Sequence, residues 1–203
     1  SFVLALLTGQ HIVLVGPPGT AKSAMARAVC QAIDGATYFE WLLGRTTTPE
    51  ELLGPWDLAA LQAGRLERVT SGKLPEAHVG FLDEIFKAST ALLNLLLGLM
   101  NERRFHNGTR VQPAPLITLV GASNEYPDPE EDTAALWDRF LFRHRVDYLA
   151  SDAGFRAMLA QPEPEPVPLL TLADVEAARQ AVQTVDAGPA VDLLVELRRR
   201  LRG

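Results

Sequence analysis

The sequence of 203 residues has a single cysteine, no long apolar run and no excess of positive charge. Because Cys30 is alone, an internal disulfide is impossible, and a reduced, cytoplasmic setting is favoured. The richest apolar stretch, Leu92–Met100, contains Asn94 and Gly98, and no run approaches the roughly 20 residues that a membrane-spanning helix needs. We therefore expect a cytoplasmic protein without a transmembrane segment.

The balance of charge argues against nucleic acid as a ligand. Lys and Arg number 19 against 25 Asp and Glu, so the formal net charge is −6, and an acidic chain is repelled by a phosphate backbone. The one concentrated basic patch, Arg198–Arg200 with Arg202, closes a predicted helix, where basic side chains complement the helix dipole. The sequence begins at Ser1 and stops inside this helix, which suggests a fragment of a longer protein.

Apolar runs alternate with helical patterns over residues 1–160. Strands are predicted at the apolar runs His11–Val15, Tyr38–Leu42, Val79–Leu82 and Leu116–Val120, and a further strand is predicted near Arg143–Val146. The main helical patterns lie at Lys22–Ile33, Ala88–Asn101 and around Ala134–Phe140. This alternation predicts an α/β domain with a mainly parallel five-stranded sheet and helices on both faces.

Two segments within this domain are predicted to form hairpins. In the first, Leu58–Leu61 and Leu66–Thr70 flank the turn Gln62–Gly64. In the second, Asn107-Gly108 is a turn pair suited to positive φ angles, between Arg104–His106 and Thr109–Gln112.

The composition changes after residue 160. Pro and Glu alternate in residues 161–170, which predicts a semi-rigid linker. Residues 171–203 contain two helical patterns, at about Leu172–Thr184 and from about Pro189 to Leu201, and Thr171 is the expected cap of the first. We therefore expect three parts: a domain at 1–160, a linker at 161–170 and the start of a helical domain at 171–203.

The first predicted strand leads into a glycine-rich loop that opens a helix and reads Gly16-Pro17-Pro18-Gly19-Thr20-Ala21-Lys22-Ser23. Backbone N–H groups of such a loop converge on phosphates, and the helix N-terminus adds a positive dipole end. Lys22 is expected to reach the terminal phosphates of ATP, and the Ser23 hydroxyl to bind Mg²⁺. Ala21 stands where the general pattern has glycine, at a helix entrance that a small side chain can occupy.

The apolar strand Val79–Leu82 ends in two acids, Asp83 and Glu84. Because neighbouring side chains on a strand point in opposite directions, we expect the two acids to have different roles. Asp83 would hold Mg²⁺ through its water shell, and Glu84 would activate the attacking water as a general base. The presence of Glu84 favours ATP hydrolysis over phosphoryl transfer to a metabolite as the predicted reaction.

Two further residues are candidates for the same reaction. Asn124 follows the strand Leu116–Val120 and should lie beside Glu84, where its amide could orient the lytic water. Arg139 is a candidate arginine finger, which would stabilise the charge on the transferring phosphoryl group. Arg143 and Arg145 lie close by in the sequence, and spacing alone does not choose among the three.

These motifs occur together with several others: Thr48–Glu51, Gly54-Pro55, Thr70–Ala77, Phe81–Ile85, Asn101–Arg103, Ala122–Glu125 and Asp138–Phe140. In this order they resemble an AAA+ ATPase of the MoxR family, with the closest match to its RavA branch. The resemblance covers about residues 3–160 well and the remainder more weakly.

The resemblance implies a P-loop AAA+ αβα core with two inserts, one within helix 2 at residues 55–75 and one at the Asn107-Gly108 hairpin before sensor 1. Asn124 would be sensor 1, and Arg139 would act on ATP held by a neighbouring subunit. The helical lid would be truncated at Gly203, before its second sensor arginine.

The resemblance also implies partners. Such proteins form rings, with a hexamer as the expected form, and act as chaperone-like remodellers, typically with a partner that carries a von Willebrand factor A domain. A nucleotide-gated protein-binding switch with little turnover is the main alternative. A small-molecule kinase is disfavoured by Asn124, and a DNA translocase by the charge.

Overall fold

The computed structural model describes residues 1–127, 133–160 and 167–202, and its centre is a parallel sheet. The strand order is β3-β4-β7-β1-β8, and every neighbouring pair is parallel. The bounds are Ile12–Val15 (β1), Tyr38–Leu42 (β3), Val79–Asp83 (β4), Thr118–Ser123 (β7) and Phe142–Arg145 (β8). The predicted five-stranded parallel sheet is therefore confirmed.

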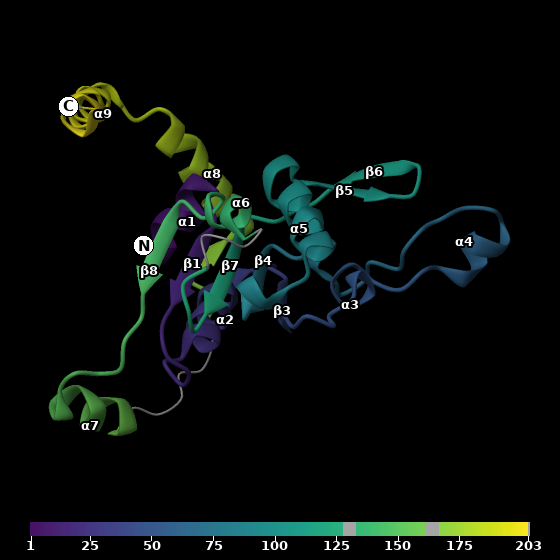
Figure 1. Cartoon of the computed structure of the whole chain (residues 1–203), viewed down its shortest axis with the longest axis horizontal. Helices are drawn as coiled ribbons and strands as arrows, with labels where there is room; N and C mark the ends of the chain where they lie inside the picture. Colours follow the sequence, from purple (N-terminus) through teal and green to yellow (C-terminus); the bar gives the residue numbers. More distant parts are fainter. Residues whose placement is uncertain (128–132, 161–166, 203) are drawn as a thin grey trace.

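Both faces of this sheet are covered by helices (Figure 1), because its strands carry apolar side chains on both sides. In β1, Val13 and Val15 belong to one buried cluster, and Ile12 and Leu14 belong to the other. The first cluster includes residues of α3 (Pro49–Leu53), α5 (Thr90–Glu102) and α6 (Ala134–Trp137). The second includes residues of α1 (Phe2–Thr8), α2 (Lys22–Gln31) and α8 (Leu172–Gln183).

The parallel register brings the carboxyl ends of three strands together. Strand β7 lies between β4 and β1, and Val15 at the end of β1 pairs with Ser123 at the end of β7. The next strand, β4, ends at Asp83. The loops that follow these three strands therefore leave from the same edge of the sheet.

The first insert differs from the predicted hairpin. Residues Leu58–Gln62 form a short helix, α4, where a strand was expected. The Asp57 carboxylate begins this helix by accepting the N–H groups of Ala59 and Ala60 at 2.9 and 3.1 Å, and the Leu-Ala-Ala-Leu-Gln sequence favours helix. In the described residues the strand pairing between the two sides of the insert is limited to an isolated antiparallel bridge between Trp56 and Arg68. A short 3-10 helix, η1 (Leu74–Glu76), follows.

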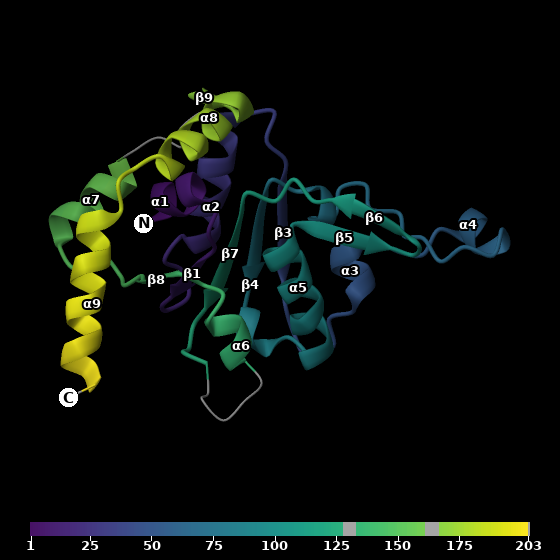
Figure 2. The same ribbon diagram turned by 90° about the horizontal axis from the view of Figure 1, so that it is seen from above.

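The second insert is the predicted hairpin, made of β5 (Arg104–Asn107) and β6 (Arg110–Pro113). Figures 1 and 2 place it on the same side of the sheet as α4. The buried Asn107 side chain joins the inserts, since it accepts the Arg68 N–H at 2.6 Å and donates to the Arg68 carbonyl at 3.1 Å. The tip of the hairpin is therefore fastened to the first insert at the Trp56–Arg68 bridge.

The C-terminal part begins with α7 (Asp152–Ala160) and contains a contact that the sequence did not predict. Strand β9 (Leu170–Thr171) pairs in parallel with β2 (Ile33–Asp34). Helix α8 packs against α1, and its predicted cap is confirmed, with Thr171 Oγ1 accepting the Asp174 N–H at 3.1 Å.

Helix α9 (Gly188–Arg202) completes the described chain. Of the predicted linker, residues 161–166 lie outside the described residues. In the part of the chain that the structure describes, no helix combines the length and the apolar character needed to span a membrane.

Candidate nucleotide-binding site

The phosphate loop joins the carboxyl end of β1 to the first turn of α2. Gly16 is held by donating its N–H to the Ser123 carbonyl at 3.0 Å. A Cβ atom at this position would lie 1.8 Å from the Val146 carbonyl oxygen, so only glycine fits. Gly19 has a φ of +77°, a left-handed conformation that glycine adopts without strain. Steric constraints therefore explain why the motif has glycine at both positions.

Ala21 occupies the position where the general motif has glycine, and its backbone is strained. Its φ of 58° and ψ of 28° are left-handed, and it is the N-cap of α2. This conformation costs a residue with a Cβ roughly 1–2 kcal/mol. The small alanine side chain therefore tolerates the expected geometry at a cost that glycine would avoid.

Lys22 is buried at the centre of the loop, with only 7% of its surface exposed. Its ammonium group donates to the carbonyls of Gly16 and Pro17, both at 2.8 Å. An ammonium has three protons, and the longer contacts, to Thr20 Oγ1 and Asn124 Oδ1, are both 3.4 Å. One proton of Lys22 is therefore weakly held.

The two acids at the end of β4 are oriented differently, but strand alternation is not the reason. The strand ends at Asp83, and Glu84 has a left-handed φ of 52°. Asp83 Oδ1 accepts the Glu84 N–H at 2.9 Å. Glu84 turns its carboxylate toward Asn124, whose Nδ2 donates to Glu84 Oε1 at 2.7 Å. Asn124 and Glu84 therefore lie side by side, as expected from the sequence.

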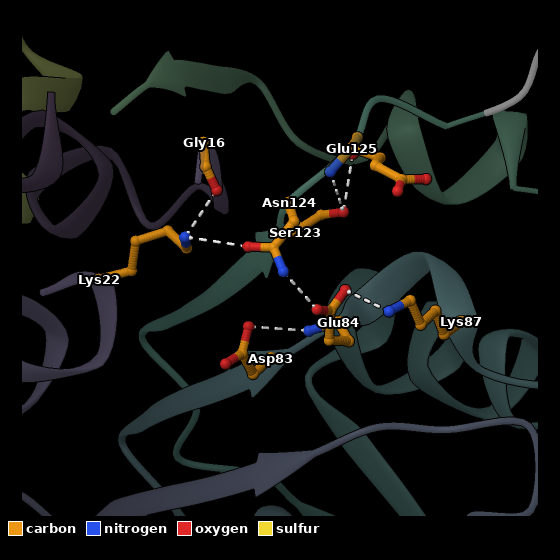
Figure 3. A network of polar contacts seen from close by, with 8 residues as sticks. All are labelled: Gly16, Lys22, Asp83, Glu84, Lys87, Ser123, Asn124 and Glu125. Carbon is orange, nitrogen blue, oxygen red and sulfur yellow. Dashed lines mark hydrogen bonds and ion pairs between the residues drawn. The ribbon is translucent and has the colours of Figure 1, made fainter. Parts of the chain in front are cut away.

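These contacts form one continuous chain of polar groups, which Figure 3 shows. It runs from the Gly16 carbonyl to Lys22 Nζ, on to the Asn124 amide, and then to the Glu84 carboxylate. Its members come from the loops after β1, β7 and β4, in the order in which these strands lie in the sheet. The strand order therefore places a cation, an amide and a carboxylate in a row.

The three candidate arginines have different surroundings. Arg143 donates to the carbonyls of Phe140 and Trp137, both at 3.1 Å, and its guanidinium stacks over the Trp137 ring. Arg145 forms an ion pair with Asp147 at 2.9 Å. Arg139 is exposed and has no side-chain hydrogen bond or ion pair within the described residues. Only Arg139 is thus available to an external anion without breaking an existing contact.

Arg139 lies at the opposite end of β1 from the phosphate loop. Phe142, three residues after it, pairs with Ile12 at the amino end of β1, whereas Gly16 follows the carboxyl end. At about 3.3 Å per residue these ends are roughly 13 Å apart. Arg139 also borders a cavity of about 410 Å³ together with Gly9 and Arg103, at the amino edge of the sheet. The structure therefore does not bring Arg139 to Lys22 and Glu84 of its own chain.

Comparison with known families agrees with this geometry. Residues 1–164 match the family model described as the MoxR domain in the MoxR-vWA-beta-propeller ternary systems. The chain belongs to this MoxR family. Among curated relatives of this MoxR domain, the uncharacterised protein MJ0812 of Methanocaldococcus jannaschii is 40% identical over 96% of the chain. The chaperone MoxR1 of Mycobacterium tuberculosis is 30% identical over 72% of the chain.

These matches cover 52% of MJ0812 and 38% of MoxR1, so the chain spans at most about half the length of these curated relatives. Among solved structures, a putative ATPase from Cytophaga hutchinsonii superposes with a TM-score of 0.71. It is 22% identical, and the match covers 91% of this chain and 57% of the solved chain. The fold is therefore that of an AAA+ core.

The residues proposed from the sequence to bind Mg²⁺ fit a hydrated ion. Ser23 lies in the first turn of α2 and Asp83 ends β4, and both present oxygen atoms, which Mg²⁺ prefers. In the described ranges no group of three or more His, Cys, Asp or Glu side chains is placed to hold a metal alone. An ion here would need water and phosphate oxygens as further ligands, which is how Mg²⁺ is usually bound beside nucleotides.

Sequence reasoning missed one residue of this site, Lys87. It lies at the end of the 3-10 helix η2 (Ile85–Lys87), and its Nζ is 3.3 Å from Glu84 Oε2. The spacing of three residues after Glu84 is the signal that could have found it, because side chains three apart meet on a helical turn. Lys87 also borders a cavity of about 850 Å³ beside Glu84.

Proposed function

We propose that this chain is the ATP-binding and ATP-hydrolysing module of an oligomeric MoxR-type AAA+ protein that remodels protein partners. The observation that carries this proposal is the row of Lys22, Asn124 and Glu84 at the carboxyl edge of the sheet. A phosphate group bound by Lys22 would lie beside an amide and a carboxylate, which are the groups that orient and activate a water molecule.

In the proposed mechanism, the loop Gly16–Ser23 binds the β- and γ-phosphates through its backbone N–H groups and the N-terminus of α2. Lys22 turns its weakly held proton to the γ-phosphate. The Ser23 hydroxyl and the Asp83 carboxylate would hold hydrated Mg²⁺, which would offset the phosphate charge. Glu84 accepts a proton from the attacking water, and Asn124 orients that water.

Arg139 completes the proposed site from a neighbouring subunit. This assignment is supported by its lack of a side-chain partner within the described residues and by its distance along β1 from the phosphate loop of its own chain. A guanidinium brought to the γ-phosphate in this way stabilises the charge of the transition state. Hydrolysis would then require an assembly, and a hexameric ring is the form we propose.

The proposed partners follow from the family and not from a surface of the chain. The family description names von Willebrand factor A domains and β-propellers as the other members of its systems, and we propose a protein of the first kind as the partner. The chaperone role, the closer likeness to the RavA branch and the cytoplasmic setting belong to the same proposal. The buried Cys30, whose pKa is raised to about 11 by burial, supports an unreactive thiol.

A nucleotide-gated switch with little turnover is the second candidate. It is favoured by one observation: both carboxylate oxygens of Glu84 already have partners, Asn124 and Lys87. In a switch these contacts would persist after ATP binds, and the protein would hold ATP without hydrolysing it.

The deciding experiment is ATP turnover per subunit measured over a wide range of protein concentration, with Mg²⁺ present and with ATP binding measured in parallel. A specific rate that rises with concentration is expected, because each site needs Arg139 from a second copy. A rate near zero at every concentration, despite tight ATP binding, would favour the switch. A substantial rate independent of concentration, with the protein shown to be monomeric, would exclude a shared site.

A further inference from the structure

Three arginines from separate elements border one cavity at the amino edge of the main sheet. Arg103 is the C-cap of α5, Arg139 follows α6, and Arg179 lies on α8. The cavity has a volume of about 410 Å³, and its wall includes His11, which immediately precedes β1. Since the phosphate loop follows the other end of β1, this cluster of positive charge is separate from the proposed ATP site of the same chain.

Two of these guanidinium groups are held close together around Gly9. Arg103 donates to the carbonyls of Leu116 and Gly9, at 2.8 and 2.5 Å. A Cβ atom built on Gly9 would lie 2.5 Å from Arg179 Nη2, so the second guanidinium packs directly against the same glycine. The packing of α8 against α1 therefore brings one positive charge next to another.

The positive charge around the cavity is not balanced by the carboxylates nearby. Among the described residues of its wall, Asp138 has the only carboxylate, and its exposed Oδ1 lies 3.6 Å from Arg143 Nη2. Arg179 Nη1 lies 3.2 Å from Glu176 Oε2 on the same helix, also in a partly exposed pair. The pKa of Arg103 is lowered to about 10, first by burial and then by the charge of Arg179. A bound anion would offset this repulsion.

The three guanidinium groups retain hydrogen-bond donors that the protein does not use. A guanidinium has five N–H donors. Arg103 uses two of them for backbone carbonyls, Arg179 contacts Glu176, and Arg139 has no side-chain partner in the described part of the chain. The two oxygens of a carboxylate are satisfied by one guanidinium fork, whereas the oxygens of a phosphate group can accept from several guanidinium groups at once. Donors from three separate elements therefore suit a phosphate group better than a carboxylate.

We propose that this cavity is a second binding site for a phosphate group, held by Arg103, Arg139 and Arg179. The site is distinct from the phosphate loop and needs no hydrolysis, so the proposal goes beyond the function proposed above. A phosphate bound here would join α8 to the core, because Arg179 lies on that helix and Arg103 is bonded to the core backbone. Arg139 would leave this site when it contacts ATP held by another copy.

The test is a calorimetric titration of inorganic phosphate into Lys22→Met, whose phosphate loop lacks its ammonium. Sodium chloride keeps the ionic strength constant, so that screening does not change. The cavity should still bind phosphate in this variant. Adding Arg179→Met or Arg139→Met should weaken the binding about tenfold or more, because each removes a charged hydrogen-bond donor. Arg156→Met, which removes an exposed arginine of α7 outside the cavity, is the matched control and should leave the affinity unchanged.

The choice of variants protects the test against loss of the fold. Arg103 is left unaltered, because its hydrogen bonds to Gly9 and Leu116 support the core. Circular dichroism checks that each variant is folded. If Lys22→Met does not fold, the arginine variants are compared with Lys22 in place, where Arg179→Met should remove one phosphate-binding event and leave that of the loop.

The outcomes decide both the site and the source of its phosphate. Equal phosphate affinity in Arg179→Met, Arg139→Met and Arg156→Met would overturn the proposal, as would the absence of binding in folded Lys22→Met. Acetate that binds as tightly as phosphate, with the same dependence on Arg179, would assign the cavity to carboxylates and overturn it as well. A repeat with AMP separates the sources: binding that depends on Arg179 supports a nucleotide phosphate, and binding of inorganic phosphate alone supports free phosphate. Because calorimetry needs no turnover, a failure of the proposed hydrolysis would leave this result unaffected.

Discussion

The two ends of strand β1 carry polar side chains that are used in opposite ways. At the carboxyl end, Lys22, Asn124 and Glu84 are linked to one another on loops, with one proton of Lys22 weakly held. At the amino end, His11 and Arg103 are bonded to backbone groups within the core. Beside them, Arg139 has no side-chain partner in the described part of the chain.

Under the proposed function, the carboxyl end of β1 carries the reaction site and the amino end supports the sheet. Loops at the carboxyl edge of a parallel sheet can change shape to receive a ligand, because few of their contacts belong to the core. The polar groups at the amino edge replace backbone hydrogen bonds that would otherwise be missing, so they must stay in place. Arg139 is the exception at this edge, because its side chain has no partner in the described residues. This fits the proposal that it contacts ATP bound by another copy of the chain.

The largest expected effect is at the carboxyl end. Glu84→Gln keeps the shape of the side chain and removes the general base, so ATP turnover should fall by about 10²- to 10⁴-fold while ATP binding is retained. Turnover and nucleotide binding are measured on the same preparation. Glu125→Gln is the control, because it alters an exposed carboxylate at the same edge. Equal turnover in Glu84→Gln and the unaltered protein would remove Glu84 as the base.

The second effect tests whether the amino end of one copy serves the carboxyl end of another. Arg139→Ala should lower turnover by about 10³-fold or more, because a finger arginine contributes that much to the rate. Mixing Arg139→Ala with Glu84→Gln should restore part of the activity, since each variant supplies the group that the other lacks.

Arg145→Ala is the control for this experiment, since Arg145 already pairs with Asp147 and lies at the other end of β8 from Arg139. It should retain turnover when tested alone. If mixed assemblies form and remain inactive, Arg139 does not act between subunits. The amino end of β1 in one copy would then not serve the site at the carboxyl end in another.

The smallest effect concerns stability at the amino end. His11 is buried between the Leu119 N–H, which donates to its Nδ1 at 2.9 Å, and the Met100 carbonyl, 3.2 Å from its Nε2. Burial, and then the nearby Arg103 charge, lower the pKa of His11 to about 4, and the backbone hydrogen bond to Met100 opposes this shift. The unfolded chain, with a pKa of about 6.5, therefore binds a proton that the folded chain excludes.

The stabilisation by neutral His11 is complete above about pH 6.5 and is lost as the pH falls toward 4, by an amount on the order of 3 kcal/mol. The free energy of unfolding, measured by denaturant titration across this range, should fall less steeply in His11→Gln than in the unaltered protein. His106→Gln, which removes an exposed histidine of the β5–β6 hairpin, should keep the original slope. An identical slope in all three proteins would contradict the burial of neutral His11.

Much of the fold was predictable because its signals are local. Apolar runs predicted four of the five strands of the main sheet, the pair Asn107-Gly108 predicted the hairpin, and Thr171 with Asp174 predicted the start of α8. The insert at residues 55–75 was predicted as a hairpin and contains α4 instead, since the Asp57 cap and a helix-forming sequence outweighed the apolar pattern. The pairing of β2 with β9 had no sequence signal, because two-residue strands carry no periodicity.

By itself, the sequence determined the phosphate loop, the acids after β4 and the order in which they occur, because these depend on residue type and spacing within a few positions. Only the tertiary structure decided which groups meet. The strand order placed Asn124 between Lys22 and Glu84, and the left-handed turn at Glu84 placed Lys87 on its carboxylate. The register of β8 placed Arg139 at the far end of β1. These contacts depend on strand pairing across the whole sheet and on the backbone conformation at single residues. Neither can be deduced from residue type and spacing alone.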